Sequence, residues 1–175
     1  MTGTTSDTRA NALAGRISAA MAAISARAAA IEAAEPLQPG VALGPGEDEW
    51  GPREVLAHVA EAVPYWHGQL ERVLTADPDA GPAPFGRIQT DMARIAVTDR
   101  DRILPVFVLL DRVNRDAAAV TARIRRLTPA ELDRIGRHSA WGDITLEDVL
   151  ERTLAGHLEG HVTQLDELFG RSRPG

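Results

Sequence analysis

Apolar residues recur at spacings of three and four along four stretches of this sequence, and that pattern limits the fold more than any other feature. The spacing places such side chains on one face of an α-helix. The stretches cover about 9–33, 52–75, 99–127 and 145–169, and none shows the alternation typical of a β-strand. A chain of 175 residues can bury its own core. We therefore predict an all-α four-helix bundle in a single domain, 1–175.

Capping residues and helix breakers mark the ends of these helices. Pro52 suits a first helical position, and capping boxes begin at Thr128, where a short extra turn is expected, and at Thr145. Prolines and glycines between 36 and 46 end the first helix. Pro64 and Pro105 are expected to kink or break the helices that contain them. The tail 171–175 is expected to fray.

The connection between the second and third helices suggests their order. Residues 76–98 are rich in proline, glycine and aspartate. Antiparallel neighbours need only about 2–8 connecting residues, whereas an extended chain of this length can return across the bundle at about 3.3 Å per residue. The linker 76–98 therefore favours parallel second and third helices, in an up-down-down-up order.

Composition excludes several classes of protein. A net charge of −6 disfavours a nucleic-acid partner, and the absence of cysteine excludes a thiolate site. The sequence shows neither a signal peptide nor an apolar stretch of the roughly 20 residues that a membrane span needs. We expect a cytoplasmic protein. The lack of lysine and the abundance of alanine are typical of a GC-rich bacterial genome.

Two histidines lie four residues apart on the fourth helix. His157 and His161 share one face with apolar residues, so both point toward the core. Buried imidazoles need hydrogen bonds or a metal ion, and both readings remain open for the pair alone. The segment HLEGH is not a zincin motif, because Leu158 stands where the general base would be and Glu159 faces away.

A third histidine can complete a metal site. His58 lies about six residues into the second helix, and His161 lies eight residues before the end of the fourth. In antiparallel helices the two come to similar height. His67 faces away, and His138 falls in a loop near Trp141. Glu61 and Gln164 are the nearest polar neighbours of these histidines, and they either support the imidazoles or are solvated rim residues.

Three segments together resemble the DinB-like bundle superfamily, which includes the N-terminal domain of mycothiol-dependent maleylpyruvate isomerase. They are WGPREVLAHVAE (50–61), WGDITL (141–146) and LAGHLEGH (154–161). The resemblance implies a metal triad of His58, His157 and His161, an up-down-down-up topology and a homodimer. Isomerase-type members use glutamate where this chain has His157 and carry a further C-terminal domain, which argues against that particular activity.

These observations lead to three hypotheses about function. The first, which the resemblance suggests, is a metal-dependent transferase that adds a thiol such as mycothiol or bacillithiol to a small electrophile. The second is hydrolysis by metal-activated water, with Glu61 as the nearest candidate base. The third is a non-enzymatic stress-related or interaction bundle. Three histidines suit zinc or nickel, among other divalent metals. Arg87 and Arg94 are either anion contacts or plain surface residues.

Overall fold

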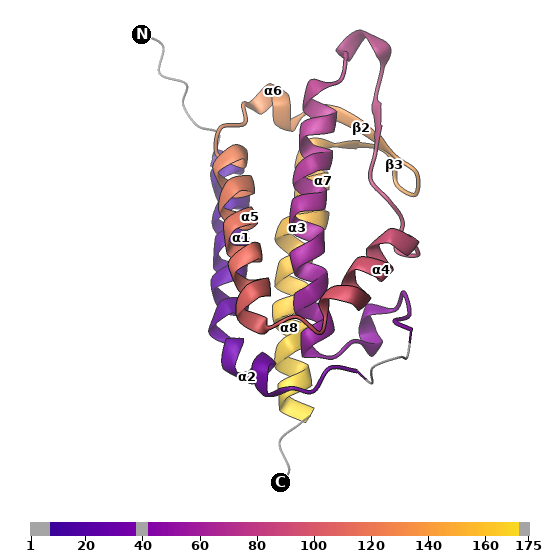
Figure 1. Ribbon diagram of the computed structural model, residues 1–175. Helices are drawn as coiled ribbons and strands as arrows, with labels where there is room; N and C mark the ends of the chain where they lie inside the picture. The colour runs from indigo at the N-terminus through magenta and orange to yellow at the C-terminus, as the bar shows by residue number, and fades with distance from the viewer. Residues whose placement is uncertain (1–7, 38–41, 172–175) are drawn as a thin grey trace.

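Four long helices form the body of the protein in the computed structural model, which describes residues 8–37 and 42–171 (Figure 1). They are α1 (Thr8–Ala26), α3 (Pro52–Thr75), α5 (Val106–Ile124) and α8 (Gly156–Arg171). Helix α1 packs against α5 and α8, and α3 packs against the same two helices. The predicted helical bundle is confirmed.

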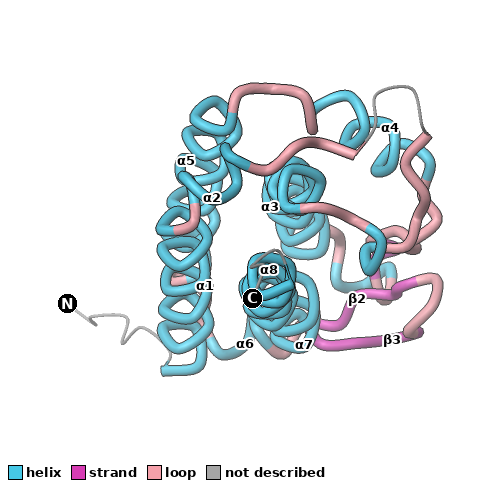
Figure 2. Tube along the Cα trace, turned by 90° about the horizontal axis from the view of Figure 1, so that it is seen from below, coloured by secondary structure: helices cyan, strands magenta, loops and turns pink. Residues whose placement is uncertain are grey.

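The long helices are arranged as a square when seen from below (Figure 2). In Figure 1, α1 and α8 run from top to bottom, whereas α3 and α5 run from bottom to top. The apolar stripes meet along the axis of the square. The largest fully buried side chains include Ile17, Ile24, Leu56, Leu70, Leu109, Ile124 and Leu150.

Two of the predicted helices are divided in the structure. The first ends at Ala26 and resumes as α2 (Ala28–Ala33). The expected third helix, 99–127, corresponds to the end of α4 (Met92–Asp101) and to α5, separated at Pro105, which lacks an amide hydrogen and stands just before α5. Helix α3, in contrast, continues through Pro64.

The expectation of no strand was wrong. Three short strands form a sheet at one side of the bundle: β1 (Ala83–Phe85), β2 (Ile135–His138) and β3 (Gly142–Thr145). Strand β2 lies in the middle, parallel to β1 and antiparallel to β3. Segment 76–98 is therefore partly structured, since it contains the turn η2 (Pro78–Ala80), β1 and the start of α4. The capping box at Thr128 begins α6 (Pro129–Leu132), as expected.

The fourth helical segment changes its winding part-way. It begins as α7 (Leu146–Leu150), passes through the π-helical turn η3 (Glu151–Ala155) and continues as α8. The Gly156 amide donates to the Glu151 carbonyl five residues back, which defines the π turn. Residues 172–175 of the expected frayed tail lie outside the described part of the chain. Within the described residues, no helix combines the length and apolarity needed to cross a membrane.

Candidate metal site

The structure brings the three predicted histidines together. Helix α3 supplies His58, and α8 supplies His157 and His161. The Nε2 atom of His157 lies 3.3 Å from that of His58 and 2.9 Å from that of His161. His58 and His161 were predicted to lie at similar heights along antiparallel helices. In the structure, the histidines of α3 and α8 are in contact at this height.

A fourth donor, Glu47, comes from outside the long helices. It begins the short turn η1 (Glu47–Glu49) before α3. Its carboxylate oxygens lie 3.5 Å from the Nε2 of His58, 3.8 Å from that of His157 and 4.0 Å from that of His161. The prolines and glycines of this region predict only a helix break, so Glu47 was not among the predicted site residues. The acidic run 47–49 directly before Trp50 was the available signal.

The donor atoms fit a divalent cation. All four lie within 4.8 Å of one another. A tetrahedral zinc ion with bonds of about 2.0–2.1 Å would separate its ligands by about 3.3 Å, close to the observed contacts. Three imidazoles and one carboxylate form a donor set that is common around zinc and related metals.

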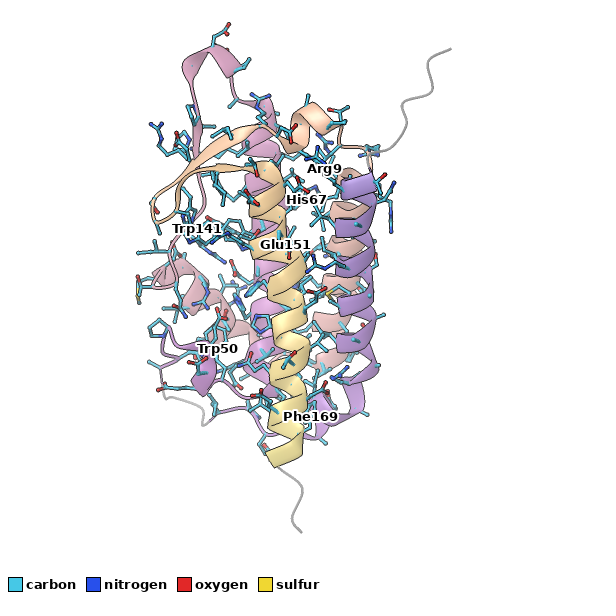
Figure 3. The ribbon with its side chains drawn as sticks, turned by 180° about the vertical axis from the view of Figure 1, so that it is seen from behind. Arg9, Trp50, His67, Trp141, Glu151 and Phe169 are labelled. Atoms are coloured by element: carbon cyan, nitrogen blue, oxygen red, sulfur yellow. The ribbon has the colours of Figure 1, made fainter. Side chains whose placement is uncertain are left out.

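Trp50 holds the η1 turn against the histidines. Its indole is buried and donates through Nε1 to the Gly44 carbonyl at 3.1 Å. The His58 ring packs edge-on against it, with ring centres 5.2 Å apart. Arg94 pairs with Glu47 and lies over the Trp50 ring, 4.8 Å from its centre. Figure 3 shows Trp50 beside α8 on the side of the bundle that also carries Trp141.

Gln164 orients His161. The side-chain oxygen of Gln164 accepts from His161 Nδ1 at 2.9 Å, and its amide donates to the Glu47 backbone carbonyl at 2.6 Å. With the proton on Nδ1, the Nε2 lone pair of His161 faces the other donors. Gln164 is therefore a supporting residue of the cluster and not a solvated rim residue.

Glu61 is also part of the site. Its carboxylate lies 3.8 Å from His58 Nδ1, a buried atom with no hydrogen-bond partner. The same carboxylate accepts two hydrogen bonds from Arg87. The side chains of Arg87 and Arg94 are only 8% and 4% exposed. The readings of Glu61 as a rim residue and of these arginines as plain surface residues were therefore wrong, because ion pairs with Glu61 and Glu47 stabilise their burial.

Burial sets the charge state of the cluster. It lowers the pKa of His58 well below the ordinary value, and His157 and His161 lower it further. Burial, followed by His157, lowers the pKa of His161 to about 4, although the hydrogen bond with Gln164 opposes this. Burial by itself raises the pKa of Glu47, but the nearby imidazoles, that of His157 most strongly, outweigh it and hold that pKa well below its ordinary value. At neutral pH, the imidazoles of His58 and His161 are therefore neutral, and the Glu47 carboxylate is ionised.

The two remaining histidines lie elsewhere. His67 faces Glu71, 3.9 Å away, as expected for a residue outside the site. His138 ends strand β2, contrary to the expected loop, and stacks on Trp141 with ring centres 3.9 Å apart. Its buried position comes from the alternation along β2, in which Gly136 and His138 point inward.

Two cavities reach the cluster. The larger, about 570 Å³, is lined by Glu47, His157 and His161 together with polar residues of α8 and with Asp48. The smaller, about 240 Å³, is lined by Glu47, His58 and His157 and extends toward Trp66, Arg87, Arg94, Trp141 and Arg152. Glu47 and His157 line both cavities, so a ligand in either would reach the same donors.

A sequence profile described as the DinB superfamily matches residues 10–165. The chain belongs to this superfamily. The match includes all four donors of the cluster, from Glu47 to His161. No curated protein matches the sequence significantly.

One solved structure has a similar fold. YfiT from Bacillus subtilis, described as a probable metal-dependent hydrolase with an unusual four-helix bundle topology, superposes with a TM-score of 0.68 at 18% sequence identity. The superposition covers 93% of this chain and 86% of YfiT. At this identity the similarity establishes the DinB-type bundle fold and leaves the chemistry to the residues of the site.

Proposed function

We propose that this up-down-down-up bundle binds one divalent metal ion, zinc or nickel, through His58, His157 and His161. We further propose that it is an S-transferase that joins a low-molecular-weight thiol to a small electrophile. The observation that carries this proposal is the meeting of two cavities at one cluster of donors. A transfer between two substrates needs two binding spaces with a common wall, and Glu47 and His157 form such a wall.

A cation held by these residues would supply the positive charge that makes a bound thiol or water lose its proton near neutral pH. Glu47 is placed to accept that proton, since its carboxylate is adjacent to all three imidazoles. Gln164 holds His161 in position through a hydrogen bond, and the Glu61 carboxylate lies 3.8 Å from His58 Nδ1. The chain contains no cysteine, so the sulfur in this reaction must come from the thiol substrate.

The larger cavity suits the thiol. It offers about 570 Å³ and polar side chains such as Asp48, Thr163 and Gln164, which can hydrogen-bond a hydroxylated carrier molecule. The smaller cavity would then hold the electrophile. This division assigns one substrate to each side of His157.

Hydrolysis by activated water is the second candidate. The sequence alone offered only Glu61 as a base. In the structure both carboxylates are paired with an arginine, Glu61 with Arg87 and Glu47 with Arg94, but Glu47 lies within 4.0 Å of all three imidazoles. A general base adjacent to the donors is what a metal-dependent hydrolase requires. The description of YfiT as a probable metal-dependent hydrolase is in line with this alternative.

Metal content and thiol dependence test the proposal. Protein purified without added metal is analysed for zinc and nickel, and the loaded protein is titrated calorimetrically with mycothiol, bacillithiol and glutathione. Transfer is followed with monochlorobimane, which fluoresces on conjugation to a thiol. We expect one metal ion per chain, binding of at least one thiol, and conjugation that is lost in His58→Ala.

Two other outcomes would favour the alternative functions. Bound metal without affinity for any thiol, together with cleavage of p-nitrophenyl acetate that depends on Glu47, would favour the hydrolase. A chain that binds no metal even when zinc or nickel is supplied would refute both enzymatic readings and leave the non-enzymatic bundle.

A further inference from the structure

The smaller cavity has a wall of positive charge and aromatic rings. Beyond Glu47 and the histidines, it is lined by Trp66, Arg87, Arg94, Trp141 and Arg152. Its volume of about 240 Å³ is below the roughly 300–1,000 Å³ typical of pockets for drug-sized ligands. The volume of the cavity therefore suits a small molecule.

The three arginines differ in their partners. Arg87 is paired with Glu61, and Arg94 is paired with Glu47. Arg152 is exposed and forms no ion pair with any carboxylate in the described parts of the chain, 8–37 and 42–171. Of the three charges, that of Arg152 is the one available to an anion that enters the cavity.

Arg152 lies beside a fixed aromatic ring. Its guanidinium carbon is 5.7 Å from the centre of the Trp141 ring, which is 40% exposed and stacks on His138 with an angle of 17° between the planes. The His138 ring accepts from the Ala140 amide through Nδ1 and contacts the Arg87 carbonyl through Nε2, both at 3.1 Å. These bonds hold His138 in place beneath Trp141.

The loop that carries Arg87 is pressed onto the same histidine. Gly86, at φ +80°, comes so close that a Cβ atom would lie 2.3 Å from His138 Cδ2. Only glycine fits there. The stacked pair of Trp141 and His138 is therefore a rigid platform built from β2, the following turn and the loop after β1.

The π turn brings Arg152 to the metal side of the cavity. Arg152 and His157 are five residues apart, which in a regular α-helix would place them about 140° apart around the axis. Five-residue hydrogen bonding across Glu151–Ala155 instead places residues five apart on one side of the helix. Both residues line the smaller cavity.

We infer that the smaller cavity binds a small, planar molecule that carries a carboxylate. The carboxylate pairs with Arg152, and the plane lies against Trp141. In the proposed transferase reaction, this molecule is the electrophilic substrate. Only its assignment as the electrophile rests on the proposed function; the binding of a planar acid does not. A planar acid matches each feature of the cavity: its limited volume, its unpaired charge and its exposed fixed ring.

Benzoate and benzamide, which have the same shape and differ in charge, test the inference. Binding to the full-length protein is measured by calorimetry and by quenching of tryptophan fluorescence, with and without added zinc. We expect benzoate to bind roughly two- to fivefold more tightly than benzamide, as one ion pair with an exposed arginine would give. Arg152→Gln should remove this preference, and Trp141→Leu should weaken both ligands.

Arg115→Gln is the matched control. Arg115 lies on α5, which contributes no residue to the cavity, and its side chain is 67% exposed. This variant should bind benzoate as the unmodified protein does. Equal affinity for benzoate and benzamide, or benzoate binding that survives Arg152→Gln, would overturn the inference. Benzoate binding that requires zinc and is unchanged in Arg152→Gln would also overturn the inference, because the carboxylate would then be a metal ligand.

These outcomes are separate from those of the transferase proposal. Benzoate binding that depends on Arg152, in a protein that binds no metal or thiol, would support the anion site and refute the transferase. Thiol conjugation without a preference for benzoate would do the reverse.

Discussion

Replacing Gln164 with leucine tests how the site is supported without changing any of the four donors. Leucine has a similar size but removes both hydrogen bonds of Gln164, one to His161 Nδ1 and one to the Glu47 carbonyl. Each such bond contributes roughly 0.5–1.5 kcal/mol. Loss of the partner of a metal-binding histidine typically weakens metal affinity by about 10–100-fold. We therefore expect Gln164→Leu to bind zinc at least tenfold more weakly.

The assay is a competition between the metal-free protein and a chromophoric chelator for zinc. Gln164→Glu is the informative companion, because it keeps an acceptor for His161 Nδ1, loses the donor to the Glu47 carbonyl and adds a negative charge. Its zinc affinity should lie between those of the unmodified protein and Gln164→Leu. Circular dichroism checks that the helices are intact. A dissociation constant for Gln164→Leu within about twofold of the unmodified protein would refute the role given to Gln164.

Three further changes have expected outcomes. His157→Ala should retain its helical circular dichroism but lose stoichiometric metal by elemental analysis, since His157 contacts both other imidazoles. Glu47→Gln, compared per metal-loaded chain, should react about 10²–10⁴-fold more slowly if Glu47 is the base, and an unchanged rate would assign the proton to another group. Arg102→Met should lower the free energy of unfolding by about 3–5 kcal/mol, because it leaves the fully buried Glu54 carboxylate without its ion pair. Chemical denaturation would show this, and the double variant with Glu54→Leu should recover part of the loss.

The features that the sequence predicted follow from regular helices. The period of 3.6 residues located the apolar stripes and placed His157 and His161 on one face. The rise per residue along two antiparallel helices predicted that His58 lies at the same height as His157 and His161. In the structure the three imidazoles are in contact. These deductions used only distances within rigid elements, which sequence spacing determines.

The features that were not predicted from the sequence depend on loops and tertiary contacts. Glu47 reaches the cluster because the buried Trp50 anchors a turn between helices, and no periodicity encodes that position. Strands β1, β2 and β3 have three or four residues each, too few for alternation to stand out. Helix α4 had a usable signal: Asp91 caps it by accepting from the Arg94 amide at 2.9 Å. That signal was hidden in a segment read as a linker.

The π turn at Glu151–Ala155 gives the last helix two independent registers. Loss of a single residue within the turn would restore regular winding and rotate Arg152 and Thr153 by about 100° relative to α8. The spacing of His157 and His161 would stay the same. Relatives that gain or lose one residue here would present different side chains to the smaller cavity while they keep the spacing of the two histidines. A sequence alignment of such a relative with this chain needs a gap in the π turn. Without that gap, it would pair residues whose side chains point in different directions.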